Sequence, residues 1–353
     1  MDLYAFGSNG SGQLGVGHAK DIDSPEQCIF DAVHMHESIR IRKIAASGTS
    51  TLVLWDNGQI HVSGAGFGNH HSQSPEGSTS FRTFPFPCEQ NPRFCSATWD
   101  AVIIATEVDV FVCGRGGKGE LGLGPKTCQA DTIQKLESFP PDGQTIVDLA
   151  SSVSHTVVVL SNGDVYGWGN GRKGQLGAPS DIVWYPRRLE GLGFKARRAT
   201  CGRAFTFVVA EPDSPKFEVL GSDKWGARSN APTNLDTWLD IGASWGSIFV
   251  HTHAGMIICW GRNDKSQLGP NELGGVLRMG IGSEHGIAQT KDAQLTCWGW
   301  GEHGNCGVAM DEAESDFRCN DVDSTVPGGH VVAGVGAGCA TTFLWTKPNS
   351  VQI

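Results

Sequence analysis

The stretch DVYGWGNGRKGQLG, residues 164–177, carries glycines at positions 169, 171 and 174 directly after a strand-like run. The spacing G-x-G-x-x-G in this context is the outline of a loop that binds the phosphates of a nucleotide. It also suits a tight turn between strands, because glycine adopts the positive φ angles that such turns require. The number of copies in the chain distinguishes the two interpretations.

The pattern occurs five times, each copy opening on a strand-ending glycine and closing on Gln, Glu or Asn, an apolar residue and glycine: GSNGSGQLG (7–15), GRGGKGELG (114–122), GNGRKGQLG (169–177), GRNDKSQLG (261–269) and GWGEHGNCG (299–307). A phosphate loop is needed once per nucleotide and must open a helix. Strand or turn residues follow these copies instead. We therefore predict a turn whose Gln or Glu side chain binds the loop's own backbone, and no nucleotide at 169–174.

Two strand-like elements alternate along the chain. Seven segments end in glycine: 3–7, 60–64, 110–114, 165–169, 217–221, 257–261 and 295–299. Seven others begin in a turn of small residues and continue as an apolar strand: 44–54, 94–105, 149–160, 199–210, 241–251, 279–290 and 332–345. Successive closing glycines are 57, 50, 55, 52, 40 and 38 residues apart, enough for about four short strands per repeat.

The chain begins with a lone glycine-ending strand and ends with a lone turn-strand element, so its two ends complete one repeat. Pairing residues 3–7 with the strand around 339–346 would close a ring and remove its open edges. The sequence predicts an all-β fold, a seven-bladed β-propeller of four-stranded antiparallel blades. We expect residues 1–353 to form a single domain.

The repeat, a strand ending in Trp-Gly or Phe-Gly followed by Q-L-G, resembles that of the regulator of chromosome condensation family of seven-bladed propellers. The resemblance spans residues 2–346, although the copies starting at Gly64 and Gly221 lack Q-L-G. YAFGSNG (4–10), QLGVGH (13–18) and D-x-D-x-P (21–25) are similar to the start of the fungal killer-toxin-insensitivity (α-tubulin suppressor) propellers.

That closer resemblance implies a non-enzymatic scaffold without a cofactor or metal of its own. It implies a heterodimer with a small, cysteine-liganded zinc- or iron-binding electron carrier. This partner serves diphthamide synthesis on elongation factor 2 and the Elongator pathway of tRNA wobble-uridine modification. The alternative, taken from the family's founding member, is a guanine-nucleotide exchange factor for a small GTPase.

Charge and composition indicate what the protein binds, where it is located and whether its cysteines are oxidised. The formal net charge is −10, from 37 acidic and 27 basic residues, which disfavours non-specific binding to nucleic acid or anionic membranes. The N-terminus lacks a basic leader and no apolar run is long enough to span a bilayer, so we expect a cytoplasmic or nuclear protein. The 11 cysteines include no C-x-x-C, and we expect reduced core thiols, with Cys113, Cys259 and Cys297 as examples.

Histidine offers the main catalytic or metal-binding alternative. Three close pairs have spacings that a metal site could use, namely His34 with His36, His70 with His71, and His251 with His253. No carboxylate or cysteine joins a pair at a fixed spacing, so we favour solvated or packed histidines. His155 and His285 occupy matching repeat positions, which favours a repeated structural hydrogen bond over a catalytic base.

Departures from the repeat point to a partner surface. Trp225 stands where Q-L-G has been lost, Trp300 takes a variable loop position, and Trp238 and Trp245 follow Trp225 in the sequence. An exposed tryptophan either anchors a partner or packs over a neighbouring loop. We expect these tryptophans to anchor a partner, with a charged rim from the run 187–203, namely Arg187, Arg188, Arg197 and Arg198. Solvated loop charge is the alternative for the arginines.

Overall fold

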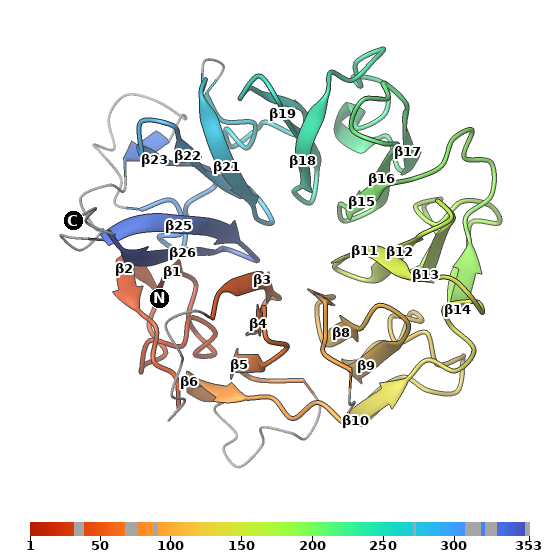
Figure 1. The fold of residues 1–353 in the computed structure, drawn as a ribbon, viewed down its shortest axis with the longest axis horizontal. Coiled ribbons are helices and arrows are strands. Elements are labelled where there is room, and N and C mark those ends of the chain that lie inside the picture. Colours follow the sequence, from red (N-terminus) through yellow and green to blue (C-terminus); the bar gives the residue numbers. More distant parts are fainter. Residues whose placement is uncertain are drawn as a thin grey trace.

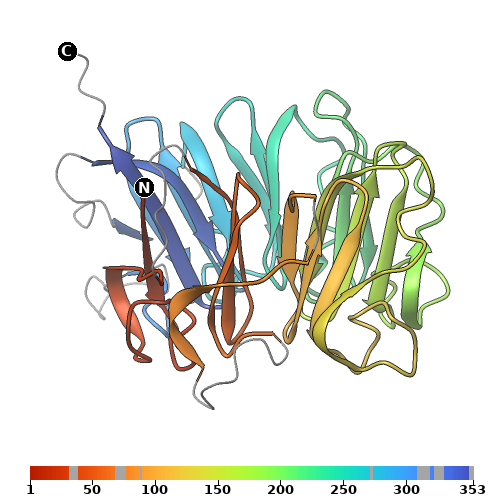
Figure 2. The same ribbon diagram turned by 60° about the horizontal axis from the view of Figure 1, so that its bottom comes forward.

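The computed structural model describes residues 1–31, 39–67, 77–87, 90–270, 273–307, 319–321 and 330–349. Its strands form seven antiparallel sheets, which stand around a central axis as the blades of a propeller (Figure 1). Seen obliquely, the strands cross the thickness of the ring and loops emerge on its two sides (Figure 2). This confirms the predicted fold class.

The blades are numbered from the sheet that contains the N-terminal strand, and the strands of each are given from the axis outward. Blade 1 contains β25 (His330–Ala337), β26 (Thr341–Pro348), β1 (Asp2–Gly7) and β2 (Ile22–Gln27); blade 2 contains β3 (Ile41–Ala46), β4 (Ser50–Trp55), β5 (Ile60–Gly64) and β6 (Ser78–Thr83); blade 3 contains β7 (Phe94–Ala97), β8 (Ala101–Ala105), β9 (Val110–Arg115) and β10 (Gln129–Lys135). Blade 4 contains β11 (Ile146–Ser152), β12 (His155–Leu160), β13 (Val165–Asn170) and β14 (Ile182–Arg188); blade 5 contains β15 (Arg198–Cys201), β16 (Phe205–Val209) and β17 (Phe217–Gly221); blade 6 contains β18 (Trp238–Ala243), β19 (Ser247–Thr252) and β20 (Ile257–Gly261); blade 7 contains β21 (Val276–Ile281), β22 (His285–Thr290), β23 (Leu295–Gly299) and β24 (Cys319–Asp321).

In the residues that the structure describes, the sheets of blades 5 and 6 have three strands, whereas the prediction gave every blade four. Their missing outer strands fall in the two shortest intervals between closing glycines, of 40 and 38 residues. In blade 5, the chain after β17 forms the short 3-10 helix η2 (Lys224–Gly226) instead. The connecting chain still passes from the end of β17 to the start of β18 on the other side of the ring, but it does so without forming a fourth strand.

The ring closes through the chain ends, as predicted. β1 pairs with β26 in continuous register from Asp2 opposite Thr346 to Gly7 opposite Thr341. Phe6 is fully buried in this strand. Burial of such a side chain stabilises the closure by roughly 1.5–3 kcal/mol.

The closing glycines show whether the glycine motif is a phosphate loop or a turn. Gly169 has φ +103°, and an added Cβ would lie 2.4 Å from the carbonyl oxygen of Ser154 in the same blade. The other six behave alike, with φ between +92° and +119° and an oxygen within 2.5 Å: Gly7, Gly64, Gly114, Gly221, Gly261 and Gly299. Gln175 Oε1 accepts from the Lys173 N–H at 2.9 Å, so the loop binds its own backbone as predicted. The motif at 169–177 is therefore a turn.

Buried polar side chains join neighbouring blades. The indole of Trp168 donates to the carbonyl of Glu120 in blade 3 at 2.9 Å. Nε2 of His155 lies 3.1 Å from the Thr206 hydroxyl, and Nε2 of His285 lies 2.9 Å from that of Thr342. Burial lowers the pKa of both histidines from 6.5 to about 4, so they remain neutral at physiological pH. The predicted structural role of the two histidines is confirmed.

Nine cysteines have side chains that the structure describes, and all nine are free thiols. Cys113 and Cys297 are fully buried and Cys259 partly so. Burial raises the pKa of Cys113 and of Cys259 to about 11, which keeps both as thiols. Within the part of the chain described, no helix has the length and apolar character needed to cross a membrane.

Candidate functional site

The inner strand of every blade turns into the second strand on the same side of the ring, which we call the turn face. The loop after each closing glycine is held against this turn by a backbone hydrogen bond. Arg115 donates to Asp100 at 2.9 Å, and Trp300 donates to Glu284 at 3.0 Å. The turns and these loops therefore share one face, and the other side of the ring is called the opposite face.

One position of the turn is equivalent in all seven blades: Gly48, Trp99, Val153, Arg203, Trp245, Ser283 and Cys339. Backbone hydrogen bonds link these turns from blade to blade. Arg203 donates to the carbonyl of Trp245 at 3.0 Å, and Trp245 donates to that of Ser283 at 2.8 Å. The side chains at this position surround the end of the central channel.

Trp99 and Trp245 meet across that end of the channel. Their ring centroids are 5.9 Å apart, with 39° between the ring planes. Trp99 belongs to blade 3 and Trp245 to blade 6, so the contact spans blades that are not neighbours. The Arg203 guanidinium carbon lies 5.4 Å from the Trp245 ring, within range of a cation–π interaction. We call these three side chains the tryptophan cap.

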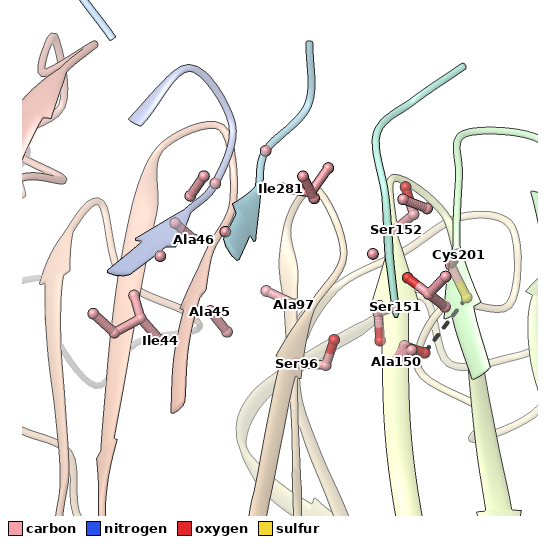
Figure 3. Close-up of a pocket in the computed structure, with 18 of the residues that line it drawn as sticks. Ile44, Ala45, Ala46, Ser96, Ala97, Ala150, Ser151, Ser152, Cys201 and Ile281 are labelled. Carbon is pink, nitrogen blue, oxygen red and sulfur yellow. Dashed lines mark hydrogen bonds between the residues drawn. The ribbon is translucent and has the colours of Figure 1, made fainter. Parts of the chain in front are cut away.

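Beneath the cap, the inner strands of all seven blades enclose a channel of about 410 Å³. Small and apolar side chains, such as those of Ala97 and Ala150, point into it (Figure 3). The Cys201 thiol donates to the carbonyl of Ala150 at 3.7 Å, and burial raises its pKa far above the usual range. Arg198, also in the lining, forms ion pairs with Asp148 and Asp240. The charge of Arg198 is therefore paired within the channel lining.

Trp225 lies on the turn face in the loop after β17. Its indole is 43% exposed and its φ is +69°, a left-handed conformation that is rare for a bulky residue. Two cations lie over the ring, Lys224 Nζ at 4.9 Å and the Arg262 guanidinium carbon at 5.1 Å from its centroid. Arg262 is fixed by the buried Glu284, whose carboxylate is 2.6 Å away. A strained backbone and a fixed cation thus hold an exposed indole in place.

The other predicted tryptophans divide between surface and core. Trp300 is 40% exposed on the turn face and Trp245 belongs to the cap, as an anchoring role requires. Trp238 is only 3% exposed and packs with Leu235 and Ile241 in a hydrophobic cluster. The expectation of a surface anchor at Trp238 is therefore wrong, because β18 begins there with the indole turned into the core.

The predicted arginines do not form a rim around the tryptophans. Arg188 lies at the far end of β14 and pairs with Asp164 at 2.6 Å on the opposite face. Arg197 pairs with Glu211 at 3.6 Å on that same face, and Arg198 lies in the channel. Arg187, on the outer strand, donates to the carbonyl of Leu176 at 2.8 Å. The expectation of one surface made of both sets is corrected, because the chain crosses the ring between them.

The histidine pairs form no site in the described residues. His251 is buried, with Nε2 2.9 Å from the carbonyl oxygen of Val276, whereas His253 is exposed. Nowhere in the described ranges do three His, Cys, Asp or Glu side chains gather as metal ligands would. The remaining pairs lie outside the described residues: His34, His36, His70 and His71.

Sequence reasoning did not single out Trp99. The signal was present in the alignment of the turns, because Trp99 in FCSATWDAVIIA takes the same position as Trp245 in IGASWGSIFVH. Two tryptophans at one position of a ring can meet across its axis. The alignment alone does not say that blades 3 and 6 bring them into contact.

Comparisons with known proteins agree with this architecture. Models of the regulator of chromosome condensation (RCC1) repeat match residues 2–54, 146–175 and 162–209. An RCC1 repeat-containing protein of Schizosaccharomyces pombe is 27% identical over 98% of this chain and 99% of its own length. The secretion-regulating guanine nucleotide exchange factor of Bos taurus is 26% identical over 96% of this chain and 81% of its own.

Two solved structures show the same fold. Prp20p from Saccharomyces cerevisiae matches with a TM-score of 0.82 at 19% identity, over 99% of this chain and 92% of that chain. Human WBSCR16 matches with a TM-score of 0.77 at 18% identity, over 98% of this chain and 100% of that chain. At such identities the likeness concerns the fold and not the partner.

Proposed function

Because this chain belongs to the seven-bladed propellers built of regulator of chromosome condensation repeats, we propose that it is a non-enzymatic scaffold that binds another protein. The observation that carries the proposal is the exposed, cation-backed indole of Trp225 on the same face as the tryptophan cap. Tryptophan and arginine dominate the energetics of protein interfaces. Fold alone does not decide between functions, so the exposed side chains of this face are what supports a bound partner.

The partner we propose is a small, cysteine-liganded zinc- or iron-binding electron carrier. Through it the scaffold would support diphthamide synthesis on elongation factor 2 and tRNA wobble-uridine modification by Elongator, in the cytosol or the nucleus. The support is the N-terminal sequence YAFGSNG (4–10), with QLGVGH (13–18) and the acidic D-x-D-x-P (21–25), which resembles that of the fungal killer-toxin-insensitivity propellers.

Co-purification tests this proposal. We expect the metalloprotein, with its metal bound, to co-purify with the full-length chain in equal amounts. Trp225→Ala should weaken the capture at least tenfold, because an anchoring tryptophan typically contributes about 2 kcal/mol or more. Tyr185→Ala is the matched control, since Tyr185 is 60% exposed but lies in the outer strand β14 and not in a turn-face loop. Equal capture by all three proteins, or none by the unaltered chain, would refute the proposal.

The alternative function is guanine-nucleotide exchange on a small GTPase. It is favoured by one observation, the similarity to the bovine protein that is named a secretion-regulating guanine nucleotide exchange factor. GDP release from purified small GTPases distinguishes the two functions. We expect the chain to leave the release rate unchanged, and a marked acceleration would replace the scaffold proposal with the alternative.

A further inference from the structure

Exposed tryptophans are confined to one face of the described structure. Of the tryptophans it describes, those with large exposed fractions are Trp99, Trp225 and Trp300, at 40%, 43% and 40%. Trp99 lies in an inner turn and the other two lie in loops after closing glycines, so all three belong to the turn face. Tryptophan is among the residues most enriched at the energetic centres of protein interfaces.

Basic side chains of the turn face lack acidic partners. Exposed lysines and arginines of its loops in blades 3 to 6 form no ion pair with any described residue, and we call them the basic rim: Arg115, Lys118, Arg172, Lys173, Arg203, Lys224 and Lys265. Two carboxylates of the same loops are already engaged, whereas Asp100, next to Trp99, is exposed and forms no ion pair with a described residue. Asp264 pairs with Arg262 at 2.5 Å, and Asp223 accepts from the Arg228 N–H at 2.7 Å.

On the opposite face several arginines are paired, although the exposed Lys195 and Lys216 there form no ion pair with a described residue. Arg188 pairs with Asp164, Arg93 pairs with Glu107 at 3.1 Å, and Arg197 pairs with Glu211. An acidic chain of net charge −10 thus leaves positive charge uncompensated around its exposed tryptophans. Such a local field favours association with an acidic surface and increases the association rate.

We propose that the turn face binds an acidic segment of a partner protein. An apolar side chain of the segment would sit on the tryptophan cap, and its carboxylates would face the basic rim. The inference extends the proposed scaffold function by naming the face and the chemistry of its partner, and it rests on that function. Arginine is well suited to this recognition, because its planar guanidinium binds a carboxylate through two parallel hydrogen bonds.

A nucleic acid would need the same positive charge, but the aromatic geometry disfavours it. Single-stranded binding sites offer open indole faces on which bases stack. Here Arg203 lies over Trp245, and Lys224 and Arg262 lie over Trp225. A base would have to displace these cations, whereas a carboxylate can bind them where they are.

The test is a titration of the full-length chain with a labelled synthetic peptide of glutamates flanking one phenylalanine, followed by fluorescence anisotropy. The glutamine analogue of the peptide and a labelled oligouridylate are the competing probes. We expect the acidic peptide to bind most tightly and to weaken as salt is raised. Arg172→Glu with Lys173→Glu should weaken it at least tenfold.

A charge-matched control separates a local site from bulk charge. Lys195→Glu with Lys216→Glu makes the same change in net charge with exposed, unpaired lysines of the opposite face, and should alter binding less than twofold. Equal losses in the two double variants, tighter binding of the oligouridylate, or no binding of the acidic peptide would each overturn the inference. Peptide binding without capture of the metalloprotein would refute only the identity of the partner. Capture of the metalloprotein without peptide binding would refute only the acidic-segment inference.

Discussion

Replacing Trp225 by alanine and by glycine should separate the backbone strain at this residue from the role of its indole. Trp225 holds φ +69° and ψ 12° in the loop after β17. A left-handed conformation costs an L-residue roughly 1–2 kcal/mol, and glycine avoids this cost. Glycine also loses more chain entropy on folding, and this cost offsets about 0.4–1 kcal/mol of the stability gained by avoiding the strain. Trp225→Gly should therefore be more stable than Trp225→Ala by about 1 kcal/mol, since both variants lose the same indole contacts.

Trp300 provides a control of opposite sign on the same face. Its indole is exposed to a similar extent, but its φ is not positive. Trp300→Ala should therefore be more stable than Trp300→Gly, by about 0.4–1 kcal/mol. Urea unfolding at equal denaturant slopes measures both differences. If the alanine variant is the more stable at both positions, Trp225 does not hold the left-handed conformation in solution and the reasoning fails.

The same pair of variants tests the indole in binding. Both lack the side chain that we propose as the anchor, so both should lose partner capture at least tenfold whatever their relative stability. Capture that follows stability instead, strong in Trp225→Gly and weak in Trp225→Ala, would mean that the loop conformation and not the indole is recognised.

Three further outcomes are expected. Deleting residues 1–8 removes β1 and should give a protein that melts earlier and self-associates, so a monomer with unchanged melting would refute ring closure through the ends. Calorimetry with ATP, GTP and NAD should show no heat, and a micromolar response that Gly171→Val removes would restore the phosphate-loop interpretation. His285, whose folded pKa is about 4 against 6.5 in a free side chain, should destabilise the fold as pH falls from 6.5 towards 4, because only the unfolded chain then binds the proton. Between about pH 7 and pH 5, the free energy of unfolding measured in urea should fall by about 2 kcal/mol less for His285→Gln than for the unaltered chain.

Much of the fold is predictable because it repeats. The closing glycine, its turn and the following Q-L-G recur often enough that their spacing identifies blades, and the half repeat at each end identifies the closure. The outer strands of blades 5 and 6 were wrongly expected, because the sequence gives the length of an interval and not the path of its chain. In the two shortest intervals between closing glycines, the number of residues did not reveal that the chain forms no outer strand.

The candidate site was harder to predict, because a position along the chain does not specify a face of the ring. Trp225 and Arg188 are only 37 residues apart, yet the strands between them place one on the turn face and the other on the opposite face. Trp99 and Trp245 are separated by two whole blades and meet only because the ring is narrow at that end. Both results depend on strand direction and ring diameter, which local patterns do not contain.

The pairing of β1 with β26 has a consequence for biosynthesis. β1 can pair with β2 soon after both are made, but it meets β26 only after residue 341 has been made, since Gly7 lies opposite Thr341. At roughly 5–20 residues per second, the edge of β1 that faces β26 stays open for about 17–70 s while six other blades assemble. During that interval the nascent protein is an open arc with two unprotected sheet edges, and in cells it depends on chaperones or on rapid synthesis to avoid aggregation.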